Sequence, residues 1–382
     1  MDVVTRFPSP DIEVVGALEL EPEGRAARIR RLPAWTRRQV PSENFAFVLR
    51  MTSGVRLVFD TDADELELVA DIIGINPYSA VPVPAVVELL VDGVPRERLV
   101  VPPALMTLVE PVHYSVERRA EPLSLRFTGL GTATKSIELW LPHTAACDLV
   151  ALRSSAAVRR TVETRRRWVH HGSSISQGGE AEAPTETWPV IAAARAGVTV
   201  QNLGFSGNAV GDPFVARTIR DLPADVLSVE IGINVVNADL MRRRFFEPVL
   251  HGFIDTVRDG HPDAPLMLIG PIPCPAVESL PGPTVWDETT RTTGTAGDPR
   301  QLAEGALSLT GIRESIASVL AARSDDAHLH YLDGRVLLPP EETDDLEDGL
   351  HPNARAYRRM GERFAAVALG PGGALGAASE LR

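Results

Sequence analysis

The alternation of short apolar runs with helix-like segments after about residue 166 is the feature that most restricts the fold of this chain. Parallel neighbouring strands need a crossover connection, which is usually a helix. This alternation therefore predicts a parallel sheet with helices on both faces. The strand-like runs are Arg167–His170, Val198–Leu203, Val226–Ile231, Pro265–Gly270 and His328–Leu332.

Start and stop signals place helices between these runs. Thr187 can cap a helix that begins with Trp188 and Pro189, and proline is tolerated at that position. Gly197 can end the same helix. Helices are also expected at roughly 238–259, 301–323 and 353–369, while residues 275–300, rich in Pro, Thr and Gly, are expected to form a long loop.

The first 150 residues have a different pattern, and the chain of 382 residues is long for one hydrophobic core. Short runs that alternate apolar and polar residues are separated by turn residues such as Asp92-Gly93. They predict an all-β sandwich or jelly-roll accessory domain over 1–150. The runs are Phe45–Arg50, Val55–Phe59, Leu66–Ala70, Val86–Val91, Leu123–Phe127 and Ser136–Leu141.

Three further boundaries follow from composition. Residues 151–165 are polar and basic and are expected to link two domains. The α/β domain is then expected to span 166–370. Gly370-Pro371 ends the last helix, so residues 371–382 are expected to form a flexible tail.

Charge and hydropathy exclude several classes of partner. The net charge of −13 argues against a nucleic-acid-binding or anionic-membrane surface. No run approaches the roughly 20 apolar residues of a membrane span, and the first residues lack a secretory signal, so a cytoplasmic location is expected. Cys147 and Cys274 match no metal or redox spacing and are expected to be ordinary thiols.

Small and polar residues cluster directly after the predicted strands. Ser174 lies in a small-residue turn after the first strand, Gly207 follows the second, and Asn234 follows the third. Asp348 and His351 lie between the fifth strand and the last helix. Ligands of open α/β sheets bind outside the carboxyl ends of the strands, so these residues are expected to share one site.

The residue types in this set suit acyl transfer. A serine hydroxyl is a weak nucleophile until a base takes its proton, and an imidazole titrates near neutral pH. Ser174 is therefore the candidate nucleophile, His351 the base and Asp348 the carboxylate that orients it. The N–H groups of Ser174 and Gly207 and the amide of Asn234 can stabilise an oxyanion. This chemistry needs no metal and no organic cofactor.

Each residue also has an ordinary explanation. Ser174 alone fits a turn, Asp348 ends a solvated acidic run, and His351 alone fits a helix cap. The ordered combination of the four segments is what favours the catalytic interpretation.

At this point the chain resembles the SGNH (GDSL-type) hydrolases over about residues 165–369. The matching blocks are Gly172–Ile175, Gly204–Asn208, Gly232–Asn234 and Asp348–Pro352. The resemblance implies a three-layer α/β/α, flavodoxin-like catalytic domain. It also implies Ser174 as nucleophile, Ser174, Gly207 and Asn234 as the oxyanion hole, and Asp348 with His351 completing the triad.

The sequence differs from the usual SGNH pattern at two positions. It also lacks the motif of a second hydrolase family. Ser173 stands where an aspartate usually precedes the nucleophile, and Val235 where one usually follows the third-block asparagine. Neither position belongs to the triad. The G-x-S-x-G elbow of α/β-hydrolases is absent around Ser174 and Ser206.

The first two blocks look like those of a subgroup that carries an N-terminal β-sandwich. Several members of this subgroup are carbohydrate esterases that remove acetyl groups. The resemblance thus implies a serine esterase for small O-acyl esters, with O-acetyl on a sugar or sugar-bearing metabolite as the expected substrate. An acyltransferase of a biosynthetic pathway and a non-catalytic glycan-binding protein are the alternatives.

Four more residues are candidates on weaker grounds. His171 beside the nucleophile turn can touch substrate or be a strand-end histidine satisfied by the backbone. Trp286, in the expected loop, can cover an acyl or sugar group or make an oligomer contact. His328 and His330 share one side of a strand, but no third ligand has a recognisable metal-site spacing. No metal site is predicted.

Overall fold

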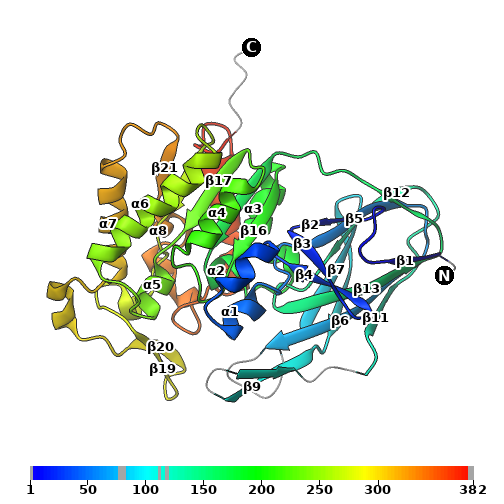
Figure 1. The fold of residues 1–382 in the computed structure, drawn as a ribbon, viewed down its shortest axis with the longest axis horizontal. Coiled ribbons are helices and arrows are strands. Elements are labelled where there is room, and N and C mark those ends of the chain that lie inside the picture. The colour runs from blue at the N-terminus through cyan, green and yellow to red at the C-terminus, as the bar shows by residue number, and fades with distance from the viewer. Residues whose placement is uncertain (1–2, 76–82, 111–112, 117–119, 377–382) are drawn as a thin grey trace, which may run out of the picture. The chain divides into compact units, whose positions relative to one another are not determined.

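The computed structural model describes residues 3–75, 83–110, 113–116 and 120–376. The chain divides into two compact units, each described below by itself (Figure 1). The first unit contains Met1–Thr164 together with Glu182–Thr185, and the second contains Arg165–Ala181 and Glu186–Arg382. Among the described residues, no helix has both the length and the apolar character needed to cross a membrane.

The described residues of the first unit form two sheets, and β6 with β9 is the parallel pair among otherwise antiparallel ones. One sheet has the order β10-β9-β6-β13-β4-β3, with β1 beside β13 and β11 beside β6. The other has the order β14-β5-β12-β7-β8, with β2 beside β5. The strands are β1 Val3–Arg6, β2 Glu13–Val15, β3 Glu19–Glu23, β4 Ala26–Arg30, β5 Arg56–Thr61, β6 Leu66–Ile75, β7 Ala85–Val91, β8 Val94–Val101, β9 Ala104–Glu110, β10 His113–Val116, β11 Leu123–Phe127, β12 Lys135–Trp140, β13 Ala145–Ser154 and β14 Val158–Arg160.

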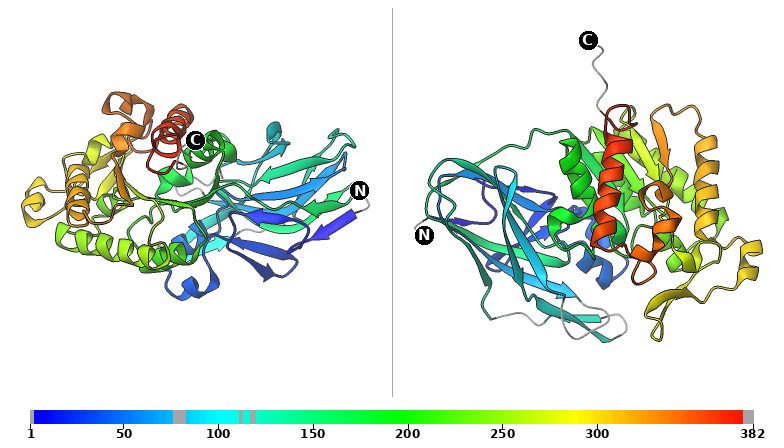
Figure 2. Two further views of the ribbon diagram at one scale, coloured as in Figure 1. Left: turned by 90° about the horizontal axis from the view of Figure 1, so that it is seen from above. Right: turned by 180° about the vertical axis from the view of Figure 1, so that it is seen from behind.

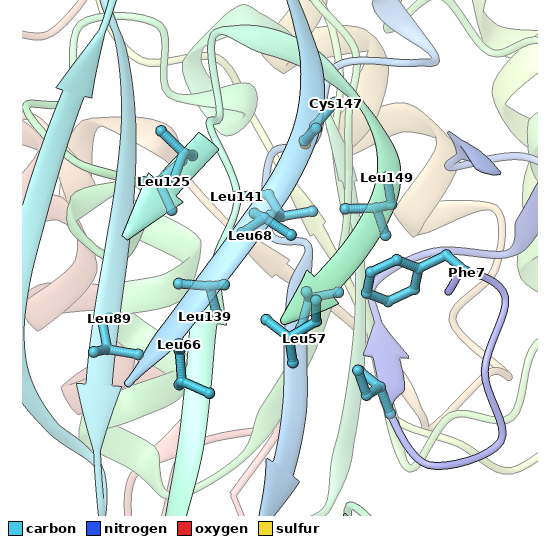
Figure 3. Packing of buried hydrophobic residues seen from close by; sticks show 14 of the residues in the cluster. Phe7, Leu57, Leu66, Leu68, Leu89, Leu125, Leu139, Leu141, Cys147 and Leu149 are labelled. Atoms are coloured by element: carbon cyan, nitrogen blue, oxygen red, sulfur yellow. The ribbon is translucent and has the colours of Figure 1, made fainter. Parts of the chain in front are cut away.

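A single apolar cluster joins the two sheets (Figure 3). Leu66 and Leu68 alternate along β6 and contribute to the same cluster as Leu57 of β5 and Leu139 of β12. Side chains two apart on a strand share a face, so this alternation buries one face of each sheet. The sandwich expected from the alternating runs is confirmed.

One expected strand is a helix. Residues Phe45–Arg50 were expected to be extended, but Glu43–Val48 form α1, after the short 3-10 helix η1 at Ala34–Arg38. The hydroxyl of Ser42 accepts the N–H of Phe45 at 3.1 Å and caps the helix. Phe45 and Val48 are three residues apart and both buried, a spacing that fits one face of a helix.

About half of the segment 151–165, expected as a linker, lies in strands, and residues 161–165 have no regular secondary structure. Its first residues complete β13, and β14 pairs with β5. Its basic composition has a local cause, because Arg153 pairs with Glu67 at 3.0 Å and Arg159 with Asp62 at 3.0 Å. Charge pairs of this kind stabilise a sheet surface, so the polarity of 151–160 belongs to the sheet, and only the last residues of the segment, at the boundary after Thr164, connect the two units.

The second unit contains a five-stranded parallel sheet with the order β16-β15-β17-β18-β21. Helix α3 packs against α9, and α6 packs against both α4 and α7. These two groups lie on opposite faces of the sheet (Figure 2), which confirms the three-layer prediction. The strands are β15 Arg167–Gly172, β16 Thr199–Gly204, β17 Val226–Glu230, β18 Leu266–Ile269 and β21 Leu329–Leu332. The α-helices are α2 Ser174–Gln177, α3 Trp188–Ala196, α4 Pro213–Asp221, α5 Ile233–Asn237, α6 Arg243–Gly260, α7 Leu309–Ala321, α8 Gly334–Leu337 and α9 Ala354–Phe364.

The boundaries between these elements are finer than expected. The helix expected at 238–259 is α6, which begins five residues later, at Arg243, and the separate short helix α5 at Ile233–Asn237 was not expected. The 3-10 helix η4, Pro299–Glu304, precedes α7, whose first turn is capped by Ser308 through the N–H of Gly311 at 3.2 Å. The remaining short elements are η2 Pro184–Glu186, η3 Pro275–Val277, the hairpin β19 Thr284–Asp287 and β20 Thr292–Thr295, η5 Pro340–Asp345 and η6 Ala365–Leu369.

The segment after the last helix is packed as far as it is described. Leu375 is fully buried, and its N–H donates to the carbonyl of Ala368 at 2.8 Å. The carbonyl of Leu375 accepts from the guanidinium of Arg166 at 3.4 Å. The expectation of a flexible tail is thus wrong for 371–376, and residues 377–382 lie outside the described part of the chain.

Replacing Leu375 by alanine is expected to lower the free energy of unfolding by about 2–5 kcal/mol, because it empties a fully buried site. Denaturant unfolding measures this difference. Leu302→Ala, at a site where the side chain is 37% exposed, is the matched control and is expected to change little. Equal, small effects of both changes would contradict the packing described for this segment.

Candidate active site

A tight turn at the end of β15 presents Ser174. Strand β15 ends at Gly172, and α2 begins at Ser174 with Ser173 as its cap. The hydroxyl of Ser173 accepts the N–H of Ile175 at 3.3 Å. Gly178 ends the one-turn helix in the left-handed conformation, with φ at 86°. Ser174 therefore lies at the carboxyl end of a central strand, with its side chain only partly buried.

Three side chains from the two ends of this unit form one hydrogen-bonded chain. The hydroxyl of Ser174 lies 2.9 Å from Nε2 of His351, and Nδ1 of His351 lies 2.6 Å from Oδ2 of Asp348. The other carboxylate oxygen, Oδ1, accepts the N–H groups of Leu350 at 2.8 Å and of His351 at 2.6 Å. The carboxylate is thus fixed by the loop that carries the imidazole.

Electrostatics keep Asp348 ionised. Burial raises the pKa of this carboxyl, but the hydrogen bonds and charge of His351, with the N–H of Leu350, outweigh burial and hold the pKa below its ordinary value. An ionised carboxylate accepts the Nδ1–H of His351, which leaves Nε2 to accept a proton from Ser174.

The loop that carries Asp348 is braced from both sides. The carbonyl of Asp348 accepts the N–H of Thr293 on β20 at 2.7 Å. The thiol of Cys274 donates to the carbonyl of Gly349 at 3.3 Å. Burial raises the pKa of the Cys274 thiol to about 11 and raises that of Cys147 as well. Both cysteines are buried thiols without a disulfide, as expected of unreactive residues.

Two loops beside Ser174 carry the predicted oxyanion donors. Strand β15 lies between β16 and β17, so the loops after these strands flank the nucleophile turn. Oδ1 of Asn234 accepts the N–H of Ala209 at 2.9 Å, which fixes the amide and leaves its NH₂ group as the donor. Gly207 has φ at 72°, and no heavy atom lies within 4 Å of the place a Cβ would take.

These donors have no partner within the described part of the chain. No hydrogen bond there uses the N–H of Ser174, the N–H of Gly207 or the NH₂ of Asn234. Groups of this kind can bind the oxygen of an incoming ligand.

An open hollow lies between α4 and α6, and it begins one residue after Ala209. It has a volume of about 420 Å³ and mostly apolar walls, which include Val210, Val249 and Phe253. Asp212 is the ionisable residue in its lining, and burial raises the pKa of that carboxyl to about 6. The sequence analysis did not find this hollow, because its walls come from two helices that only the fold brings together.

His171 lies in the core and does not reach the surface as a substrate contact would. Its side chain is fully buried and stacks on Phe253, with ring centroids 6.0 Å apart. Its Nδ1–H donates to the carbonyl of Leu203 at 2.8 Å. Burial lowers the pKa of His171 to about 4, so the ring is neutral near pH 7. Of the two interpretations given for His171, these contacts match the strand-end histidine that is hydrogen-bonded to the backbone.

Trp286 and the two strand histidines are not members of the hydrogen-bonded chain of Ser174, His351 and Asp348. Trp286 is on β19 and is 42% exposed, and its register partner on β20 is Thr293, the residue that binds the Asp348 carbonyl. His328 is exposed and His330 is partly buried. Within the described ranges, no three His, Cys, Asp or Glu side chains are grouped so as to hold a metal ion.

The fold and this geometry define a class. The sheet is parallel with its strands in the order 2-1-3-4-5, and a serine after its first strand is joined by hydrogen bonds to a His–Asp pair before the last helix, an arrangement whose chemistry suits acyl transfer. Residues 171–359 match the sequence model of the GDSL-like Lipase/Acylhydrolase family. The α/β unit of this chain thus belongs to that family, and the chain is an acyl hydrolase enzyme.

Solved structures similar to this chain extend over both of its units. The salicylyl-acyltransferase SsfX3 from a tetracycline biosynthetic pathway is 26% identical, with 94% of this chain and 95% of that chain covered and a TM-score of 0.79. A GDSL-like lipase from Bacteroides ovatus is 18% identical, with 95% and 96% covered and a TM-score of 0.66. An acetyl xylan esterase from Butyrivibrio proteoclasticus is 13% identical, with 95% and 97% covered and a TM-score of 0.54. Comparison with curated protein sequences gave no significant match.

The buried neutral ring of His171 predicts a pH dependence of stability. Its pKa is near 4 in the folded chain and near 6.5 when unfolded, so the unfolded chain binds the extra proton as pH falls below about 6.5. Acidification from pH 7 to pH 5 should cost roughly 2 kcal/mol at this residue. The variant His171→Asn keeps a donor for the Leu203 carbonyl but does not titrate.

Denaturant unfolding of wild type and His171→Asn at both pH values measures this difference. The variant is expected to lose less stability than wild type on acidification. Identical pH dependence in wild type and His171→Asn would contradict the burial of a neutral ring.

Proposed function

We propose that this chain is a serine esterase that hydrolyses small O-acyl esters, most specifically O-acetyl groups on a sugar or a sugar-bearing metabolite. The observation that carries the proposal is the continuous hydrogen-bonded chain from the Ser174 hydroxyl through His351 to Asp348. The roles of nucleophile, base and orienting carboxylate follow from that order.

The reaction proceeds in two acyl-transfer steps. Nε2 of His351 takes the proton of the Ser174 hydroxyl as its oxygen attacks the ester carbonyl carbon. The oxyanion that forms is stabilised by the N–H groups of Ser174 and Gly207 and by the amide of Asn234. His351 then gives the proton to the departing alkoxide, which leaves as the alcohol, and Ser174 keeps the acyl group as an ester.

Water completes the turnover. His351 takes a proton from a water molecule as that water attacks the acyl-enzyme, and the same donors stabilise the second oxyanion. Collapse of this intermediate breaks the bond to the Ser174 oxygen and returns the proton to it through His351. The acid leaves and the serine is restored. The protein groups supply every proton transfer, so the proposal includes no metal and no cofactor.

The substrate class rests on the neighbours. Similar structures include an acetyl xylan esterase and a family two carbohydrate esterase from Clostridium thermocellum in complex with cellohexaose. These structures align with 95% and 82% of this chain, which is more than its α/β unit alone. These resemblances support an acylated sugar as substrate.

Acyl transfer is the second candidate, and one observation favours it. SsfX3, which is an acyltransferase, is 26% identical over 94% of this chain. The same triad and acyl-enzyme serve both reactions, which differ only in whether water or an acceptor hydroxyl attacks the second time. The assembled Ser174–His351–Asp348 chain weighs against a purely glycan-binding protein.

Hydrolysis of p-nitrophenyl esters of increasing chain length tests the proposal. Wild type is expected to act on the acetate and to slow with chain length, and Ser174→Ala is expected to lose at least about 10³-fold in kcat because it lacks the attacking oxygen. Ser206→Ala, in the neighbouring loop, is the matched control. Retained turnover in a folded Ser174→Ala protein would overturn the assignment.

Product analysis in the same experiment separates hydrolysis from transfer. With an added sugar alcohol as acceptor, an esterase is expected to release free acid at the rate of p-nitrophenol release. Quantitative appearance of the acylated acceptor in place of free acid would favour the acyltransferase instead.

The amide of Asn234 gives a separate prediction. Asn234→Asp keeps the oxygen that accepts the Ala209 N–H but removes the NH₂ donor, so kcat is expected to fall by about 10²–10³-fold with little change in KM. Asn237→Ala, on the same short helix α5, is the control and is expected to retain activity. A similar fall of kcat in Asn234→Asp and Asn237→Ala would mean that the changes disturb helix α5, and it would contradict a specific role for the Asn234 amide.

A further inference from the structure

We propose that Glu230 is a positioning residue for the nucleophile: its carboxyl group holds the peptide unit from which the Ser174 turn begins. This inference rests on the proposed role of Ser174. Glu230 is the last residue of β17, beside β15 in the sheet, and its side chain is only 5% exposed. The sequence analysis assigned it no role.

The carboxyl of Glu230 lies directly under the nucleophile turn. Its Oε2 accepts the backbone N–H of Ser173 at 2.8 Å and the hydroxyl of Ser176 at a longer 3.5 Å. The other oxygen, Oε1, is buried and has no hydrogen-bond partner in the part of the chain that the structure describes. Burial raises the pKa of this carboxyl. A buried polar atom left unpaired is costly and is uncommon without a functional reason.

The bond to Ser173 clamps one peptide unit from both ends. The N–H of the Gly172–Ser173 peptide points to Glu230, and its carbonyl, on Gly172, accepts the N–H of Phe205 at 2.8 Å. A peptide unit is planar, so fixing its N–H and C=O fixes its orientation. The next peptide carries the N–H of Ser174, and the Ser174 hydroxyl follows. Glu230 thus sets the direction from which both groups of Ser174 project.

Glycine at position 172 makes this approach possible. A Cβ on Gly172 would lie 2.8 Å from Oε2 of Glu230 and still closer to the hydroxyl of Ser176. Any side chain at this position would push the carboxyl or the turn away. The close packing of strand end, carboxyl and turn is therefore built into the sequence at both Gly172 and Glu230.

A buried relay of hydrogen bonds ends at the same carboxyl, and its direction can be assigned. Trp168 Nε1–H can only donate, and it donates to the Ser228 hydroxyl at 2.8 Å. The Ser228 proton then goes to Nδ1 of His170 at 2.7 Å, so His170 carries its proton on Nε2. Nε2–H donates to the Ser176 hydroxyl at 2.8 Å, and Ser176 donates to Glu230.

The relay requires an acceptor at its end. Burial lowers the pKa of His170 well below its ordinary value, so the ring stays neutral. It accepts one hydrogen bond, from Ser228, and donates one, to Ser176. Oε2 of Glu230 accepts both the Ser176 hydroxyl and the Ser173 N–H. A glutamine carbonyl could accept the same two bonds, but an aliphatic side chain of similar size could not.

Steady-state kinetics of wild type, Glu230→Gln and Glu230→Leu on p-nitrophenyl acetate test the proposal. Glu230→Leu has no acceptor for the Ser173 N–H, so the turn is free to move. A displacement of about 1 Å at a reacting group can lower the rate by about 10²-fold. We therefore expect kcat to fall by about that factor with little change in KM. Glu230→Gln keeps the acceptor and is expected to stay within a few-fold of wild type.

The rescue by glutamine separates positioning from folding and from charge. Wild-type kcat in a folded Glu230→Leu protein would overturn the proposal, and so would a loss in Glu230→Gln as large as in Glu230→Leu. If Glu230→Leu does not fold, Glu230→Ala takes its place, because it also lacks the acceptor for the Ser173 N–H, and its kcat is expected to fall by a similar factor. Wild-type kcat in a folded Glu230→Ala protein would overturn the proposal.

The pH dependence of stability supplies an independent readout. The folded pKa of Glu230 is raised above the unfolded value, so its contribution to stability is present at low pH and is lost as pH rises through the folded pKa. Glu230→Gln is therefore expected to melt at a higher temperature than wild type at pH 8 and to lose this advantage near pH 4. A variant that melts below wild type at pH 8 would contradict the buried carboxyl.

Failure of this proposal is distinguishable from failure of the proposed function. If the Ser174→Ala protein is active, Ser174 is not the nucleophile and the proposed function fails, whatever the role of Glu230. An inactive Ser174→Ala protein together with a fully active Glu230→Leu protein would leave the esterase assignment intact and remove only the positioning role.

Discussion

The hydrogen bond between the hydroxyl of Ser174 and Nε2 of His351 is the contact on which the account of this protein depends. It joins two groups that are 177 residues apart in the chain, at a distance of 2.9 Å. Neither group is reactive alone, since the serine needs a base and the imidazole needs an orienting partner. Asp348 provides that partner because its carboxylate is fixed by two N–H groups of its own loop. The parallel sheet brings the Ser174 turn and the loop of Asp348 and His351 together at the carboxyl ends of its strands.

The position of β15, between two other strands, explains how the Ser174 turn is held in place. Strand β15 has β16 on one side and β17 on the other, so one turn can be braced from both neighbours. Phe205 braces it from the β16 side through the Gly172 carbonyl, and Glu230 from the β17 side through the Ser173 N–H. In this second contact the other carboxyl oxygen of Glu230 is buried and has no hydrogen-bond partner among the described residues, which is a costly arrangement. On the roles proposed for Ser174 and Glu230, stability is given up at the turn that positions the nucleophile.

Much of this arrangement could be predicted from the sequence, and the exceptions have physical causes. The order of strands and helices, and the place of Ser174, Asn234 and His351 after strand ends, follow from local patterns that survive in the fold. The helix at Glu43–Val48 was missed because apolar residues at 45, 47 and 48 fit a short strand as well as a helix. The strands within 151–165 were missed because Arg153 and Arg159, which make the segment look basic, pair with acidic side chains from distant parts of the chain. Glu230 and the hollow beside Asp212 depend on burial and on contacts between distant segments, which no local pattern encodes.

The most direct test is to trap the acyl-enzyme. Wild-type protein is mixed briefly with p-nitrophenyl acetate, quenched with acid and digested, and the acetylated peptide is located by mass spectrometry. The account predicts one acetyl group, on the peptide that contains Ser174, and its absence in the Ser174→Ala protein. An acetyl group that forms and turns over on any other residue, with Ser174 unmodified throughout, would contradict it.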